Sequence, residues 1–124
     1  MSQEKLQAVY DKVKAHLIKQ NAKSENIDGT CMYRGDRGLQ CGIGCLIPDE
    51  LYSFDLEERV VYDPDDEGSG NDILHVLKEA GIDIEATNMP ELLRALQNAH
   101  DNVETSRWGD HLELVIAPKY NLTP

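Results

Sequence analysis

The sequence predicts an α+β fold, namely a mostly helical single domain of about four main helices with a small antiparallel β-hairpin or sheet. Three observations support this prediction. Four segments carry apolar residues at three- and four-residue spacings, the pattern of an amphipathic helix. Two β-favouring stretches flank a Gly-Asp-Arg-Gly turn at residues 35–38. The length of 124 residues suits one domain, so we expect residues 1–124 to fold together.

The first two predicted helices cover residues 3–21 and 71–80. In each, the apolar residues fall on one face, while lysines of the first helix lie off that stripe. Gly81 is expected to stop the second helix, because glycine readily takes the left-handed conformation that ends helices. The two buried stripes are expected to consist of Leu6, Val9, Tyr10, Val13 and Leu17, and of Ile73, Leu74 and Leu77.

Two more helices are predicted toward the C-terminus. Asn88 is expected to cap the third, with Glu91 at the position typical of a capping box. Thr105 or Ser106 is expected to cap the last helix, and Pro118 to end it. The predicted buried stripes are Leu92, Leu93, Leu96 and Ala99 for the third helix, and Trp108, Leu112, Val115 and Ile116 for the last.

The β element is predicted before the second helix. Residues 30–34 and 39–41 favour extended structure, and the turn between them predicts a short hairpin. The segment ERVVY at residues 58–62 is a possible third strand.

The most distinctive stretch is CMYRGDRGLQCGIGCLIPDELY, which we call the signature block (residues 31–52). Its glycines allow close approach of the backbone to its neighbours, and its apolar density is high. We therefore predict that it is the structural centre of the domain. The residues expected to be mostly buried are Cys41, Ile43, Cys45, Leu46 and Ile47.

The three cysteines, Cys31, Cys41 and Cys45, offer a metal-binding interpretation. An odd number in a chain without a secretion signal argues against a disulfide framework. Structural zinc needs four ligands, and the spacing C-x9-C-x3-C supplies only one close pair. The fourth ligand would be a histidine brought in by the fold, with His75, His100 and His111 as the candidates.

Two other interpretations of the cysteines remain open. A nucleophilic thiol needs a nearby base, and His100, followed by Asp101, is a candidate. The structural interpretation, which we favour, is that the thiols simply pack in the core as small hydrophobic groups. We accordingly expect no catalytic residue, no resident metal and no cofactor.

The acidic loop at residues 63–72 matches part of a calcium-binding loop. Asp63, Asp65, Glu67 and Gly68 match the first, third, fifth and sixth positions of an EF-hand. Leu74 stands where the bidentate glutamate should be, so a solvated acidic turn is the simpler interpretation.

The formal net charge is −11, and residues 41–124 carry all of the excess. Such a surface repels phosphate backbones, so we expect no direct nucleic-acid binding. It favours solubility and steers the chain toward basic partners. No apolar run is long enough to span a membrane and no signal peptide precedes the first helix, so we expect no membrane association and a cytoplasmic location.

The signature block resembles a group of small uncharacterised proteins found in phages, prophages and bacteria. Members share a helix, the pattern C-x-Y-R…G-x-x-C-x-x-G-C-L-I-P-D-E-x-Y, a stretch similar to LLRALQNAHDN at residues 92–102, a tryptophan and a closing helix. The likeness covers residues 6 to about 122, and Pro118 departs from the group's continuous closing helix. The resemblance implies a shared fold and a phage or mobile-element origin, and it implies no activity.

Together these observations favour a small acidic accessory protein that is non-enzymatic and acts by binding an unidentified protein partner. The alternative is a small metal-binding or thiol-dependent protein that uses Cys31, Cys41, Cys45 and His100.

Overall fold

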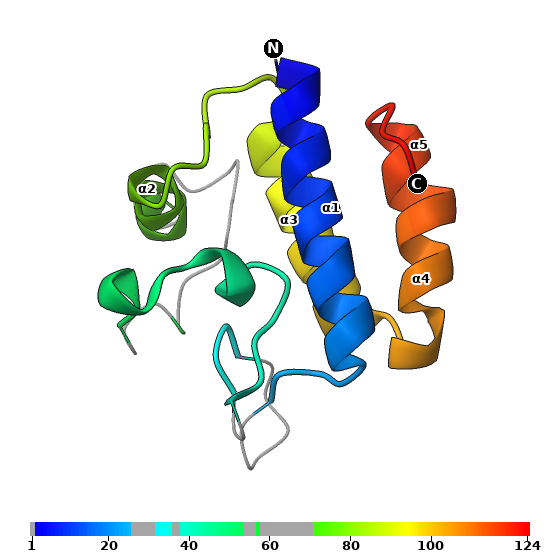
Figure 1. Ribbon diagram of the computed structural model, residues 1–124, viewed down its shortest axis with the longest axis horizontal. Coiled ribbons are helices and arrows are strands. Elements are labelled where there is room, and N and C mark those ends of the chain that lie inside the picture. Colours follow the sequence, from blue (N-terminus) through cyan, green and yellow to red (C-terminus); the bar gives the residue numbers. More distant parts are fainter. Residues whose placement is uncertain (1, 26–31, 36–37, 54–56, 58–70) are drawn as a thin grey trace.

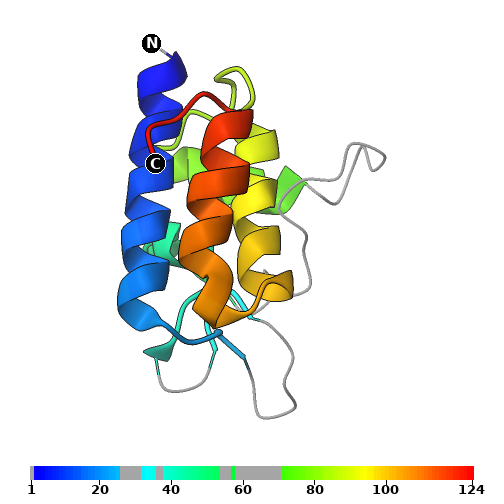
Figure 2. The same cartoon turned by 90° about the vertical axis from the view of Figure 1, so that its right-hand side faces the viewer.

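The computed structural model describes residues 2–25, 32–35, 38–53, 57 and 71–124. Two helices, α1 (Ser2–Gln20) and α3 (Met89–Asn102), lie side by side in the middle of the molecule (Figure 1). The last helix lies on one side of this pair. Residues 41–52 and α2 (Asn71–Glu79) lie on the other side. Figure 2 shows the last helix in front of the seam between α1 and α3, and it contacts both.

The last helix (residues 108–119) is built from α4 (Trp108–His111), the π-helical turn η6 (Leu112–Ile116) and α5 (Ala117–Lys119). The 3₁₀ turn η5 (Thr105–Arg107) precedes it. The prediction that Pro118 ends this helix is wrong, because the helix continues to Lys119. The Ala117 N–H bonds to the Leu112 carbonyl five residues back, which completes the π turn. Pro118 is the next residue, and because proline has no backbone N–H, it leaves no hydrogen-bond donor unpaired at this position.

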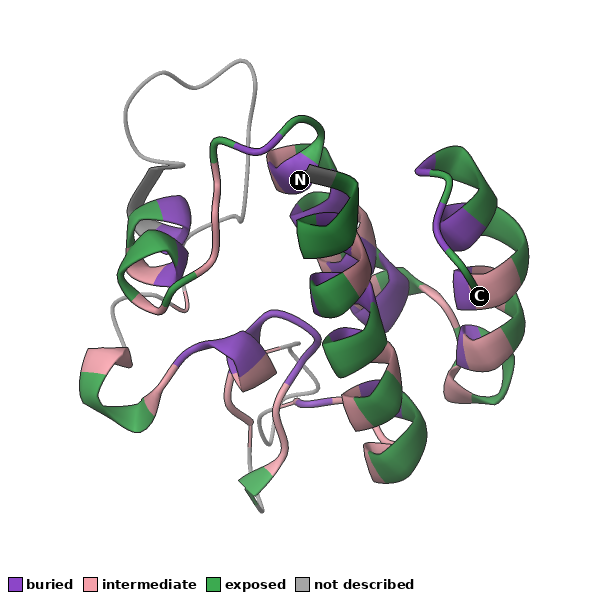
Figure 3. Ribbon diagram, turned by 45° about the horizontal axis from the view of Figure 1, so that its top comes forward, coloured by how far each residue is buried: buried purple, intermediate pink, exposed green. Residues whose placement is uncertain are grey.

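The apolar stripes predicted for α1, α2 and α3 are all buried, as Figure 3 shows for the inward faces of these helices. On the last helix, Trp108, Leu112 and Ile116 are buried as predicted. The prediction for Val115 is wrong, because this side chain is 52% exposed. The π turn places more residues in one turn than a regular helix does, so Val115 rotates off the buried face.

Of the helix ends predicted for α2 and α3, the stop of α2 at Gly81 is confirmed and the cap of α3 by Asn88 is not. Gly81 stops α2 as predicted, with a φ of 101°, and the Ile82 N–H bonds to the Leu77 carbonyl at 3.0 Å. Asn88 does precede α3, but the predicted side-chain cap is wrong. Asn88 has a left-handed φ of 69° and makes no side-chain capping bond.

The predicted α+β class is wrong, and the fold is all-α. Among the described residues there is no strand, and the predicted hairpin is reduced to an isolated antiparallel bridge between Arg34 and Gln40. Two backbone bonds flank it, Gly35 N–H to Leu39 O at 2.9 Å and Cys41 N–H to Tyr33 O at 3.1 Å. The possible third strand at residues 58–62 lies outside the described residues.

The ladder stops at the next pair because its backbone groups are bonded elsewhere. A longer hairpin would need the Tyr33 N–H to bond to the Cys41 carbonyl. The Tyr33 N–H instead donates to the Glu57 carboxylate at 2.7 Å. The Cys41 carbonyl instead accepts from the Cys45 N–H at 3.1 Å and starts a helical turn. A side-chain acceptor and a local turn therefore replace the second strand.

The signature block forms two 3₁₀ turns, η2 (Gly44–Leu46) and η3 (Asp49–Leu51). Cys41, Ile43, Leu46 and Ile47 are buried as predicted, whereas Cys45 is only partly buried. The block packs against one side of α1 and α3, and the last helix packs on the other side (Figure 1). The central position is therefore occupied by the two helices, and the block is one outer layer of the core.

We expect Leu46→Ala to lower the free energy of unfolding by about 2–3 kcal/mol, the low end for such truncations, because an outer layer can relax into part of the cavity. Leu46 is 4% exposed and belongs to the main core. Urea unfolding of the variant and the parent measures the difference. A change below about 0.5 kcal/mol, the scale of a surface substitution, would mean that this part of the block is not core.

No helix in the described part of the chain combines the length and the apolar character needed to cross a membrane. The 19-residue helix α1 illustrates this, because its outward face carries exposed Lys5, Lys12 and Lys19.

Candidate functional site

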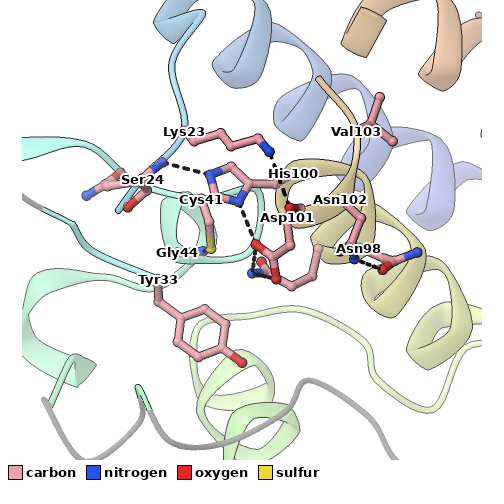
Figure 4. A network of polar contacts seen from close by, with 12 residues as sticks. Lys23, Ser24, Tyr33, Cys41, Gly44, Asn98, His100, Asp101, Asn102 and Val103 are labelled. Atoms are coloured by element: carbon pink, nitrogen blue, oxygen red, sulfur yellow. Dashed lines mark hydrogen bonds and ion pairs between the residues drawn. The ribbon is translucent and has the colours of Figure 1, made fainter. Parts of the chain in front are cut away.

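The predicted cysteine and histidine site is partly assembled by the fold. His100, from α3, is hydrogen-bonded to Ser24 and Asp101 (Figure 4). Cys41, from the signature block, is buried like His100, but its own bonds go to Tyr33, Gly44 and Cys45. Cys31 lies outside the described residues, as do residues 63–70 of the acidic loop. The functional potential of the site therefore depends on how Cys41, Cys45 and His100 are bonded.

His100 is fully buried near the end of α3, and both of its ring nitrogens are bonded. Nε2 accepts from the backbone N–H of Ser24 at 2.8 Å, and Nδ1 lies 2.7 Å from Asp101 Oδ1. Because a backbone N–H can only donate, Nε2 must be unprotonated, and the ring proton sits on Nδ1 and is donated to the carboxylate. The ring also packs near Trp108, with 5.5 Å between centroids. His100 thus ties α3 to the segment that follows α1.

The same network holds Asp101 from several sides. Its carboxylate accepts two bonds of 3.1 Å from the side-chain amide of Gln97, and its carbonyl accepts from Lys23 Nζ at 3.4 Å. These bonds fix the carboxylate that orients His100. A general base needs a ring nitrogen facing the group that it deprotonates. Here both nitrogens of His100 face partners within the fold.

The two described cysteines are each hydrogen-bonded within the signature block. Cys41 Sγ accepts from the Gly44 N–H at 3.1 Å, and Cys45 Sγ donates to the Gly42 carbonyl at 3.1 Å. Burial raises the pKa of both thiols, that of Cys45 to about 11. A thiolate is the reactive form of cysteine. The raised pKa favours the protonated, less reactive form of both side chains at neutral pH.

We expect iodoacetamide to leave Cys41 and Cys45 unmodified in the folded protein at pH 7. With a pKa of about 11, only about one Cys45 side chain in ten thousand is a thiolate at that pH. Its alkylation should speed up as the pH rises toward 11. Peptide mass spectrometry resolves each cysteine separately, and unfolding in urea provides the control in which both react. Rapid native modification of Cys41 at pH 7 would support a catalytic thiol instead.

The histidines proposed as zinc ligands do not converge. His75 lies on the exposed side of α2, 3.1 Å from Glu79, and His111 lies on the last helix. Among the described residues, no group of three His, Cys, Asp or Glu side chains is arranged to hold a metal ion.

The signature residues Arg34, Asp49 and Tyr52 contact one another. The Arg34 guanidinium lies 2.7 Å from Asp49 Oδ1, donates to the Ile47 carbonyl at 2.8 Å, and stacks 4.5 Å from the centre of the Tyr52 ring. The ion pair itself stabilises little, because the Asp49 side chain is 88% exposed. The contacts join the two ends of the block, which gives these signature residues a structural role.

Glu57 completes this arrangement, and sequence reasoning missed it. Its carboxylate accepts from the backbone N–H groups of Tyr33 and Arg34 at 2.7 and 3.0 Å, and from the Tyr52 hydroxyl at 2.5 Å. Burial and this bond raise the pKa of Tyr52 to about 12. Glu57 follows the signature block by five residues in a run of charged residues, so no sequence pattern distinguishes it from the charged residues around it.

A surface groove of about 420 Å³ lies between the end of α3 and the last helix. The π turn presents Leu114 and Val115 to it, and these side chains are 72% and 52% exposed. Val103 adds apolar surface from the segment after α3. Only Ile18, at 49%, is a comparably exposed large apolar side chain among the described residues, and it does not line the groove. Sequence periodicity predicted burial for Val115, so it gave no signal for this groove.

Comparison with family models, with curated proteins and with solved structures found no match to this chain. The resemblance to small phage and bacterial proteins therefore stays a prediction.

Proposed function

We propose that this chain is a small accessory protein that acts by binding another protein through the groove beside the last helix. The observation that carries the proposal is the exposure of Leu114 and Val115 side by side on that helix. Exposed apolar side chains next to a concave surface are typical of interaction sites. The phage or mobile-element origin and the cytoplasmic location expected from the sequence belong to the same proposal.

The charge of the chain supports a protein partner. With a net charge of −11, it repels nucleic acid and is attracted to basic surfaces. The alternative of a metal or thiol site draws no support from Cys41, Cys45 and His100. Both ring nitrogens of His100 and the sulfur of each cysteine have a hydrogen-bond partner within the fold.

Pull-down of tagged protein from bacterial lysate, at low and at physiological salt, tests the proposal. We expect the parent to enrich a partner at both salt concentrations, because apolar contacts persist when charges are screened. Val115→Arg should reduce the capture about tenfold or more, which corresponds to about 1.4 kcal/mol of binding free energy.

Ile18→Arg is the matched control, because Ile18 is about as exposed as Val115 and lies outside the groove. It should leave capture unchanged. Both variants should keep the parent's stability within about 0.5 kcal/mol, as expected for surface substitutions. Enrichment that disappears at physiological salt would indicate charge steering alone and would count against the proposal, as would enrichment of no protein at all.

A further inference from the structure

The side chains that line the groove indicate which class of partner segment can bind there. This inference rests on the proposed function. The groove is partly open to solvent, and three elements form its walls: the end of α3, the segment through η5, and the last helix. Its apolar lining comes from Val103, Leu114 and Val115. Such an open groove takes in side chains projecting from a partner segment.

Two of the common peptide-recognition modes are disfavoured by the groove's composition. Addition of an extended strand needs a sheet edge, and the described residues contain no strand. Recognition of a proline-rich segment uses grooves lined with aromatic side chains. No Phe, Tyr or Trp side chain lines this groove. The remaining common mode for an apolar groove is an amphipathic helix that inserts residues spaced three and four apart.

The charged side chains beside the apolar lining indicate which charge the partner segment carries. Glu104 and Asp110 line the groove, both are exposed, and neither carboxylate is ion-paired with a described residue. Arg107 is the one Lys or Arg side chain in the lining, so the local balance is negative, as is the chain as a whole. A second copy of this chain would bring another net charge of −11, and like charges facing each other oppose association.

We infer that the groove binds a basic amphipathic helix of a partner protein, with apolar side chains on Val103, Leu114 and Val115 and with Lys or Arg residues facing Glu104 and Asp110. Lysine and arginine at the edges of such a helix keep their charged ends in solvent beside the carboxylates. The arrangement gives apolar affinity at the centre and charge selectivity at the rim.

Photocrosslinking of the full chain in bacterial lysate tests this inference. A benzophenone amino acid replaces Val115 in one sample and Ile18 in a matched control, and mass spectrometry maps the partner peptide that is crosslinked. The inference expects a crosslink from position 115 and none from position 18. The captured segment should carry net positive charge and apolar residues at helical spacing.

The captured segment is then synthesised and titrated against the purified chain. Val115→Arg should weaken its binding about tenfold or more, and so should replacement of the peptide's Lys and Arg residues by Glu. Ile18→Arg should leave the affinity unchanged. Circular dichroism should show the peptide gaining helix when bound.

Other outcomes separate the inference from the proposed function. A crosslink from position 115 to an acidic segment or to an extended segment of another protein overturns the inference while the proposed binding role stands. A crosslink from position 115 to a second copy, or from position 18 alone, overturns both, because the proposed function places a different protein in the groove. If the parent captures no protein at all, the proposed function fails, and the inference fails with it.

Discussion

We expect Gly44→Ala to lower the free energy of unfolding by about 3 kcal/mol or more, the upper range for overpacking. An added Cβ would lie 1.8 Å from the Tyr33 carbonyl oxygen and 2.7 Å from the carbonyl carbon. Both atoms are backbone, so no side-chain rotation relieves the clash. Moving Tyr33 would also disturb its bonds to Cys41 and to Glu57.

Gly109→Ala is the matched control for this prediction. Its Cβ would meet only the terminal methyl of Ile18, at an ordinary contact distance of 3.7 Å. Because Gly109 lies in α4, alanine should be neutral or should stabilise the protein by up to about 1 kcal/mol. Chemical denaturation of both variants gives the comparison. Equal stability of Gly44→Ala and the parent would show that the signature block does not pack as described.

We expect His100→Leu to destabilise the protein by about 3–5 kcal/mol, the cost of breaking a buried hydrogen-bonded network. Leucine fills much of the same space, but it leaves the Ser24 N–H without an acceptor and Asp101 without the ring proton. Ser24 is itself fully buried, so water cannot replace the lost bond without entering the core.

His100→Gln separates hydrogen bonding from packing. The glutamine amide oxygen can reach the position of Nε2 and accept from the Ser24 N–H, so this variant should retain part of the lost stability. Urea unfolding of the two variants should therefore rank them parent, Gln, Leu. If Leu proves as stable as the parent, the network contributes nothing and His100 is free for another role.

The helices were predictable because a helix with one buried face has apolar residues at regular three- and four-residue spacings in the sequence. The stripes of α1, α2 and α3 follow the helical period closely, and each is buried. Prediction from this spacing fails where the backbone departs from the period of a regular α-helix. The π turn at Leu112–Ile116 breaks the register of the last helix, so Val115 was assigned to the core when it lies on the surface.

The prediction of a β-hairpin failed for a different reason. Residue preferences around the turn at residues 35–38 favour extended structure, but a ladder also needs free backbone partners. Glu57 takes the Tyr33 N–H, and a helical turn takes the Cys41 carbonyl. The Glu57 bond is not local to the predicted strands, so no window of sequence around them indicates it. The turn from Cys41 to Cys45 is local, and it competes with the strand for the same carbonyl.

The candidate site was predicted at the level of residue identity. Cys41, Cys45 and His100 could be predicted only as a list of chemically suitable residues. Their bonding depends on Ser24, Gly44 and Asp101, which the fold brings together from three separate segments. That bonding decides between a catalytic site and a structural one, and it is a tertiary property.

Amide hydrogen exchange of the chain, measured with and without its captured partner, tests most directly the claim that the signature block is structural and the last helix binds. The account predicts that binding slows exchange within residues 102–115, which line the groove or connect its walls. Residues 41–52 should exchange at the same rate in both states. Protection gained at residues 41–52, with none at residues 102–115, would contradict the account and assign the binding surface to the signature block.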